Sequence, residues 1–276
     1  MKVKLFDKDV IKKYLSFLGI LEVCSAILME PLNLYETLYS CDWFYVIYIS
    51  ILVLAYLACW RHSNRFQNIN LRINNTDVEI KYGDMFNENG KKVITFNEYF
   101  DTIVDNKIIN AGSINGIFIR KKIQDIPKFD RQLSTLLKDF SYDLNEQRKK
   151  GKKKKYPLGT MVMYDNEFLI TAFTKFDENN NAEITKVEYI KLLMEIWKKI
   201  DVYYAQEEIV IPLLGNGTTR IKEFKKHEQE LLKIILWTFK MSNITYAAPS
   251  KIKIILHESS RKNINLFKIK EEFNNE

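Results

Sequence analysis

The sequence predicts an α/β domain whose sheet is covered by helices, preceded by an N-terminal hairpin of two transmembrane helices. Three observations predict this architecture. Long apolar stretches lie close to the N-terminus, short β-branched segments alternate with amphipathic ones after residue 65, and a glycine-rich turn follows one of these segments. We therefore expect a hairpin over residues 1–65 and a ligand-binding domain over residues 66–276.

Composition leaves several classes of partner open. The chain has 276 residues and a formal charge of +7, which is compatible with nucleic acid, a membrane surface or small anions and selects none of them. Its three cysteines, Cys24, Cys41 and Cys59, are widely spaced and form no CxxC pair. That spacing argues against a disulfide framework or a zinc site, so we expect no metal and a reducing compartment.

The segment Trp43–Trp60 predicts a transmembrane helix. It holds 18 residues without a charge, and a helix of that length spans about 27 Å, close to the ~30 Å hydrocarbon core of a bilayer. The tryptophan at each end suits the membrane interface. A buried core helix is the alternative, but such a helix does not need to be apolar on every face.

A second apolar segment, Tyr14–Met29, predicts the other helix of the hairpin. It holds 16 residues and carries Glu22 in its middle. A signal peptide is the alternative, yet Glu22 interrupts the segment and no cleavage-site pattern follows. We expect Glu22 either to be protonated and bonded to Ser25 or a neighbouring helix, or to line a pore between several copies.

Charge around the two segments predicts the orientation of the hairpin. Lysines precede the first segment and arginines follow the second, whereas the connecting loop has neither and carries three acids, Glu30, Glu36 and Asp42. By the positive-inside rule, both termini face the cytoplasm. We therefore expect a two-pass protein of the inner (plasma) membrane whose larger domain is cytosolic.

Strands alternate with helices after residue 65. The segments that predict strands are Asn68–Arg72, Asp77–Lys81, Lys92–Phe96, Thr160–Tyr164, Glu167–Thr174, Glu208–Leu213 and Lys251–His257. Apolar residues at helical spacing predict helices near 129–140, 187–197 and 221–241. The alternation implies a sheet covered on both faces, and ligands of such sheets bind beyond the carboxyl ends of the strands.

The stretch PLLGNGTTR at 212–220 predicts an anion site. Gly215 and Gly217 follow an apolar strand, and we expect a helix to begin near Thr219. Glycine allows positive φ and close approach of the backbone, successive amides form an anion nest, and a helix N-terminus adds partial positive charge. Phosphate fits such a site, although a plain strand-to-helix turn with a threonine cap would look similar.

Two further turns complete the candidate site. The small-residue turn at 111–116 precedes a helical stretch at 117–123, and Asp84 follows a strand end at Tyr82-Gly83. A carboxylate in that position can accept an exocyclic amine. By itself, Asp84 is only a turn residue.

Three stretches, KYGDMF at 81–86, SINGIF at 113–118 and LLGNGTTRI at 213–221, resemble the macro domain, a fold that binds ADP-ribose. The resemblance implies a macro-domain-like mixed sheet flanked by helices, with an ADP-ribose derivative as ligand and no other cofactor. It implies that Asp84 contacts the adenine amine. It also implies that the diphosphate and nearer ribose are surrounded by Ser113, Asn115, Gly116, Gly215, Asn216, Gly217 and Thr218.

The likeness extends to the two apolar N-terminal segments and to two further stretches, VITFNEYFDT at 93–102 and YPLGTM at 156–161. With the turns, they resemble the membrane-anchored macro effectors of Thoeris anti-phage defence. That resemblance implies that a TIR-domain protein makes the nucleotide signal from NAD, and that the effector binds it, forms a homo-oligomer and disrupts the membrane. A passive receptor without a pore is the other reading of a ligand domain joined to a membrane hairpin.

One segment departs from the hydrolytic members of the macro-domain family, which carry an Asn-Ala-Ala-Asn type segment after the second strand. Here the segment is FNEYFD at 96–101. Asn97 or Asp101 is expected to face the distal ribose, but no arrangement that would activate water is recognisable. A sensor is therefore favoured over the alternative, a membrane-anchored ADP-ribosyl hydrolase.

The run RKKGKKKK at 148–155 has seven basic residues in eight. It predicts a solvated loop, which in a membrane-tethered domain would be able to touch anionic lipid. It lacks the interleaved aromatic residues of a nucleic-acid platform, so we expect no nucleic-acid partner. His257, at a strand end, lacks a nucleophile or acid at a recognisable spacing, and a surface or core role is expected.

Overall fold

The structure is a computed structural model of the whole chain. It describes residues 3–29, 43–177, 180–217, 220–222, 228–247 and 249–274. Thr218 and the loop acids Glu30, Glu36 and Asp42 lie outside the described residues. The chain divides into two compact units, one of Met1–Ile69 with Asn265–Glu276 and one of Asn70–Ile264. The expected boundary near residue 65 stays a prediction.

A nine-stranded mixed sheet forms the centre of the larger unit. Its order is β1-β2-β11-β9-β3-β7-β8-β10, with β6 beside β7. The central strands pair in parallel, in the order β2, β11, β9, β3 and β7. Strands β6 and β8 are antiparallel to β7. The strands are β1 (Asn68–Ile73), β2 (Thr76–Tyr82), β3 (Lys91–Asn97), β6 (Met161–Tyr164), β7 (Phe168–Phe176), β8 (Ala182–Thr185), β9 (Ile209–Pro212), β10 (Arg220–Lys222) and β11 (Lys251–Leu256).

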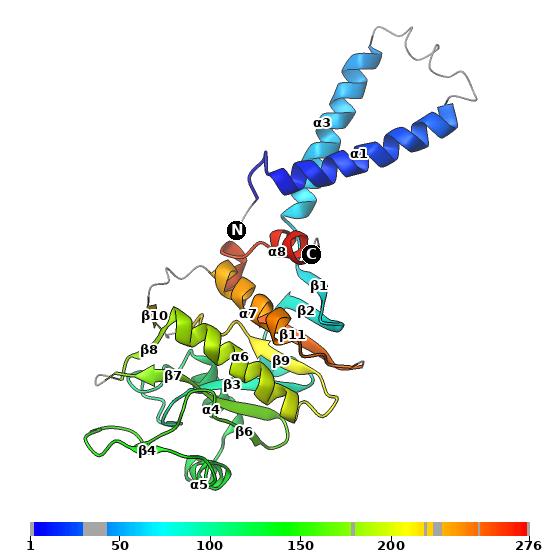
Figure 1. The fold of residues 1–276 in the computed structure, drawn as a ribbon. Coiled ribbons are helices and arrows are strands. Elements are labelled where there is room, and N and C mark those ends of the chain that lie inside the picture. The colour runs from blue at the N-terminus through cyan, green and yellow to red at the C-terminus, as the bar shows by residue number, and fades with distance from the viewer. Residues whose placement is uncertain are drawn as a thin grey trace. The chain divides into compact units, whose positions relative to one another are not determined.

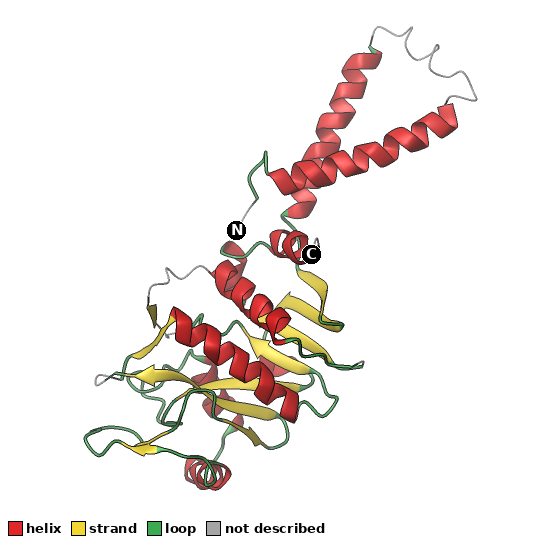
Figure 2. Cartoon of the chain, in the orientation of Figure 1, coloured by secondary structure: helices red, strands yellow, loops and turns green. Residues whose placement is uncertain are grey.

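Helices cover both faces of the sheet, as the alternation predicts. On one face, α4 (Ile114–Lys122) and α5 (Ile126–Leu136) bury Phe118 and Phe129 against β3 and β7. On the other face, α6 (Lys186–Tyr203) and α7 (Glu228–Ser242) lie side by side (Figures 1 and 2). Trp197 of α6 packs there against Phe239 of α7. Strands covered on both faces read as continuous apolar runs, and all four residues of β9 are buried.

The seven predicted strands are confirmed, with small shifts at their ends. Four strands were not expected: β8, β10 and the two-stranded hairpin of β4 (Asp143–Leu144) and β5 (Lys154–Lys155). Each has two to four residues, too few for the alternation of a strand to stand out in the sequence.

The prediction of a helix beginning near Thr219 is wrong. Residues Arg220–Lys222 form β10, which pairs in parallel with β8, and Ile221 lies opposite Ile184. The described part of helix α7 begins at Glu228. Ile221 is buried and lies against the glycine turn, so burial of this β-branched side chain favours the strand. Among the described residues, the element that follows the turn is therefore a strand and not a helix N-terminus.

The smaller unit joins both ends of the sequence. It contains α1 (Lys8–Met29), α3 (Phe44–Ser63) and α8 (Leu266–Asn274). Val3, Val10 and Phe267 form a small buried core. Trp60 Nε1 donates to the carbonyl of Val3 at 3.0 Å, and Lys268 pairs with Asp7 at 2.6 Å. The helix from the C-terminal segment is thus part of the same small fold as the first two helices.

One described helix is long and apolar enough to cross a membrane. It is α3, over Tyr45–Ser63, and only 6% of this stretch is buried. Helix α1, as far as it is described, is not long and apolar enough to be counted as a membrane-crossing helix. Glu22 is exposed on α1, and the side chain of Ser25 lies outside what is described. The two-helix transmembrane hairpin and its orientation therefore stay predictions.

Candidate functional site

Two adjoining pockets form a cleft along the carboxyl ends of β2, β11, β9, β3 and β7. They share the residues Ser113, Ile114, Pro212, Leu213 and Gly217. The outer end, beside β2 and β11, has a volume of about 590 Å³. The inner end, beside β3 and β7, is narrow, with a volume of about 80 Å³. The cleft lies where ligands of parallel sheets bind.

The glycine turn after β9 borders both ends of the cleft. Gly215 has φ of +83°, and a Cβ there would lie 3.1 Å from Ile221 and 3.2 Å from Tyr189. The Tyr189 hydroxyl donates to the carbonyl of Leu214 at 2.9 Å and holds the turn in place. Gly217 differs, because a Cβ there would meet nothing within 4 Å. Gly215 is therefore required by the fold, whereas Gly217 keeps space open in the cleft.

The N-terminus of α4 borders the cleft on its other side. Ser113 is the N-cap and accepts from Gly116 N–H at 3.3 Å. Its hydroxyl also lies 2.6 Å from Asn115 Oδ1. A Cβ at Gly116 would lie 2.2 Å from the carbonyl of Asn110, so this glycine serves the packing of the turn. The helix end brings partial positive charge to the middle of the cleft.

Asp84 lies at the outer end of the cleft and already has partners. Oδ1 accepts from Phe86 N–H at 3.0 Å, and Oδ2 accepts from Lys121 Nζ at 3.1 Å. Burial raises the pKa of the Asp84 carboxyl, but these two hydrogen bonds and the charge of Lys121 outweigh it and lower the pKa below its usual value. Asp84 is therefore a carboxylate at neutral pH.

Two residues of the outer end were missed in the sequence reasoning. Lys121 pairs with Asp84 from α4, and His257 lines the same end, where its ring accepts from Ser259 N–H at 3.3 Å. No sequence signal brings Lys121 to Asp84. His257, however, directly follows β11, and the rule that ligands bind beyond strand ends would have selected it.

Asn97 lines the inner end of the cleft, but Asp101 does not. Asn97 Oδ1 accepts from Tyr99 N–H at 2.9 Å, and its amide nitrogen donates to Asp101 Oδ2 at 3.0 Å. Asp101 is fully buried behind Asn97, and Arg148 Nη2 donates to its carboxylate at 2.7 Å. The two candidates for the distal ribose are thus neighbours, and only Asn97 reaches the cleft surface.

Glu98 lies behind the same end and is buried. Its Oε1 accepts from Phe176 N–H at 3.1 Å, and Lys155 lies 3.6 Å from Oε2. Burial raises the pKa of the Glu98 carboxyl, while these two partners lower it, and the net shift is upward. Phe176 lines the cleft, so Glu98 fixes part of its inner wall.

The run Arg148–Lys155 is only partly a solvated loop. Arg148 pairs with Asp101, Lys152 pairs with Asp130 at 2.6 Å, and Lys155 belongs to β5. The expectation of a solvated loop is correct only in part, because acids distant in sequence bind several of these cations. Lys149 and Lys150 remain exposed, and contact with lipid stays a prediction.

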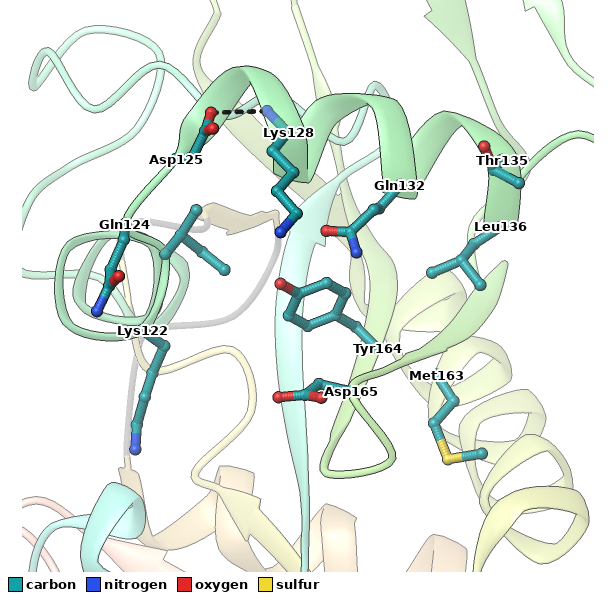
Figure 3. A pocket seen from close by; sticks show the side chains of 11 residues that line it. Lys122, Gln124, Asp125, Lys128, Gln132, Thr135, Leu136, Met163, Tyr164 and Asp165 are labelled. Atoms are coloured by element: carbon teal, nitrogen blue, oxygen red, sulfur yellow. Dashed lines mark hydrogen bonds between the residues drawn. The ribbon is translucent and has the colours of Figure 1, made fainter.

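A separate pocket lies between α5 and the turn from β6 to β7 (Figure 3). Lys128 and Gln132 face it from α5, and Tyr164 and Asp165 face it from the other side. It contains none of the residues that the sequence singled out, so it is not the candidate site. Within the described residues, no His, Cys, Asp and Glu side chains gather to hold a metal ion.

The cleft and the mixed sheet define an α/β domain with a glycine turn and a helix N-terminus facing one ligand site. Residues 78–257 match the family described as Thoeris protein ThsA, Macro domain. The chain is also 40% identical over 209 residues to Thoeris protein ThsA of Bacillus amyloliquefaciens (strain Y2), covering 74% of this chain and 70% of that protein. The chain therefore belongs to the Thoeris ThsA family and carries its macro domain.

Two solved macrodomain structures from Oceanobacillus iheyensis are more distant likenesses. One is described as containing ADP, with 14% identity and a TM-score of 0.49, covering 76% of this chain and 98% of that chain. The other is described as having MES bound, with 13% identity and a TM-score of 0.47, covering 76% and 98%.

Proposed function

We propose that this chain is a membrane effector of anti-phage defence that senses an ADP-ribose derivative in its cleft. One observation carries the proposal: the turn of Gly215 and the N-terminus of α4 meet at the shared middle of a cleft that lies beyond five parallel strand ends. Backbone amides and a helix N-terminus together favour a diphosphate. Membership in the Thoeris ThsA family supports the same ligand class.

The two ends of the cleft suggest how such a ligand lies. The diphosphate occupies the middle, beside Ser113, Gly215 and Gly217. The adenine occupies the outer end, which has the larger volume, and its amine shares Asp84 with Lys121. The distal ribose occupies the inner end beside Asn97, which has to widen because its volume is about 80 Å³.

The effector step is a proposal about the helices. A TIR-domain protein supplies the nucleotide, its binding favours an assembly of several copies, and α3 with α1 then permeabilises the bilayer. The apolar stretch Tyr45–Ser63 supports a membrane location. A ligand shifts an assembly equilibrium only by its difference in affinity between the two states, so the assembled form must bind the nucleotide more tightly.

Dye leakage from liposomes tests this proposal. The full chain is reconstituted, and small molecules extracted from cells with an active TIR-domain protein are added, with extracts from cells lacking that protein as the control. We expect leakage only with the first extract. Measurable binding of the nucleotide without any leakage would contradict the effector step.

The variant Glu22→Leu separates a pore from a passive receptor. If Glu22 lines a pore, the variant keeps its ligand affinity and changes the leakage rate, because a charge at the lipid or pore surface is removed. Identical leakage in the two proteins would place Glu22 outside any conducting path.

The ADP-ribosyl hydrolase is the weaker alternative. It depends on Asn97 or Asp101, and the contacts described above speak against it, because Asn97 is bonded to Asp101 and Asp101 is fully buried. A hydrolase would release ADP-ribose from a modified protein, and Asn97→Ala would abolish that release. Unchanged substrate after long incubation would eliminate this alternative.

A further inference from the structure

A buried polar cluster lies directly behind the inner end of the cleft. We call Asp101, Arg148 and Lys152 with the neighbouring Asn97 and Asn180 the Arg148 clamp. Asp101 is 0% exposed and the Arg148 side chain is 7% exposed. A buried ion pair is costly to break, because removing one partner leaves an uncompensated charge in the interior. The basic run is thus anchored in the core at its first residue.

The carboxylate of Asp101 is fully occupied. It accepts from Asn97 Nδ2 at 3.0 Å, from Arg148 Nη2 at 2.7 Å and from the backbone N–H of Lys152 at 2.7 Å. Arg148 Nη1 also donates to Oδ1 at 3.2 Å. Asp101 therefore joins β3, through Asn97, to the β4–β5 hairpin, through Arg148 and Lys152.

Gly151, the one glycine inside the basic run, lets the hairpin approach Asp101. It has φ of +87°, and a Cβ there would lie 2.6 Å from Asp101 Oδ1 and 2.8 Å from Arg148 Nη1. Any other residue would clash with the ion pair and would adopt an unfavourable backbone conformation. Gly151 is thus required for the hairpin to pack against the Arg148–Asp101 ion pair.

The clamp supports three parts of the inner wall. Through Asp101 it orients the amide of Asn97, which lines the cleft. The guanidinium of Arg148 lies 5.7 Å from the ring centroid of Phe176, another lining residue. Arg148 Nη2 donates to Asn180 Oδ1 at 2.8 Å, and Asn180 precedes β8, whose first residue also lines the cleft.

We infer that the Arg148–Asp101 pair positions Asn97 to donate one amide hydrogen into the inner end of the cleft. One hydrogen of the Asn97 amide goes to Asp101 and its oxygen accepts from the backbone, so the second hydrogen is left for a ligand. Its partner is an acceptor oxygen on the second sugar of a nucleoside diphosphate. The inference rests on the proposed function, because it assigns the distal sugar to this end.

Calorimetric titration of the full chain in detergent with ADP-ribose and with ADP tests this role, since ADP lacks the distal sugar. The double variant Asp101→Asn/Arg148→Gln removes both charges together, and Gly151→Ala keeps both charges and displaces the hairpin. We expect each variant to weaken ADP-ribose binding about tenfold, which is the effect of losing one hydrogen bond. ADP affinity should stay within about twofold of the wild-type value. Lys149→Ala and Lys150→Ala, in the same hairpin, should change neither affinity.

The outcomes separate this inference from the proposed function. If wild-type protein binds neither nucleotide, the proposed function fails and the inference fails with it. If wild-type protein binds ADP-ribose and the clamp variants bind both nucleotides as well as wild type, or lose both equally, only the positioning role is overturned. A loss in Lys149→Ala or Lys150→Ala as large as in the clamp variants would also overturn it, because charge alone would then explain the effect.

Discussion

The two ends of the cleft are built in different ways. At the outer end, the side chains of Asp84 and Lys121 pair while 41% and 55% exposed. At the inner end, Asp101 and Arg148 pair while 0% and 7% exposed. Exposed pairs contribute little to stability, whereas a buried pair is destabilising to break. Changes at the outer end should therefore alter affinity alone, and changes at the inner end should alter folding as well.

Arg148→Ala should give the largest effect on stability. It leaves the Asp101 carboxylate buried without its counter-charge, which costs about 3–5 kcal/mol of unfolding free energy. The matched control Lys150→Ala removes an exposed charge from the same hairpin and should stay within about 0.5 kcal/mol. Urea unfolding followed by tryptophan fluorescence, to which the buried Trp197 contributes, measures both. Equal stability of the two variants would mean that the inner end is no more integrated into the fold than the surface.

Gly217→Val should give the largest effect on affinity without loss of stability. A Cβ at Gly217 meets nothing within 4 Å, so the branched side chain fits the protein and occupies the space of the diphosphate. We expect at least about a hundredfold weaker binding of ADP. Gly215→Val is the contrasting variant and should lower the melting temperature, because Gly215 has positive φ and close neighbours. Normal ADP affinity in Gly217→Val would refute this placement of the phosphates.

Asp84→Ala should give the smallest effect and confine it to the outer end. Loss of one hydrogen bond to the adenine amine should weaken the binding of ADP about fivefold and leave the binding of ribose 5-phosphate unchanged. The pKa of Asp84 is lowered below its usual value, so the carboxylate persists as the pH falls, and this preference should not change between pH 7 and pH 5. Lys121→Ala removes the donor to Asp84 Oδ2 and should not weaken the binding of ADP. Equal losses for ADP and ribose 5-phosphate would contradict the adenine assignment.

The strands were predictable because their residues carry a local signal. Runs such as IVIP in β9 and KIKIIL in β11 are rich in β-branched residues, and such residues favour pleated, buried surfaces. The prediction for the segment after Gly217 was wrong because a local pattern does not show which strands pair across a sheet. Its apolar residues fit helical spacing, but Ile221 pairs with Ile184, and pairing across the sheet decided the structure.

The cleft was predictable where residues follow strand ends directly. Asn97 is the last residue of β3, and Asp84 and Gly215 closely follow β2 and β9. Strand ends of a parallel sheet meet at one edge. The clamp was not predictable, because Asp101 and Arg148 are 47 positions apart in the sequence. A run of lysines around one arginine shows charge, and only the fold shows which of these cations is buried.

Phe267 and Lys268 are synthesised after every strand of the sheet, yet they complete the small core that Val3 and Trp60 begin. Chains emerge from the ribosome N-terminus first, and early segments fold before later ones. The base of the first two helices therefore stays open until the cleft-bearing unit has been made. A fold that is closed by its own C-terminal segment cannot be completed while the strands are still being synthesised.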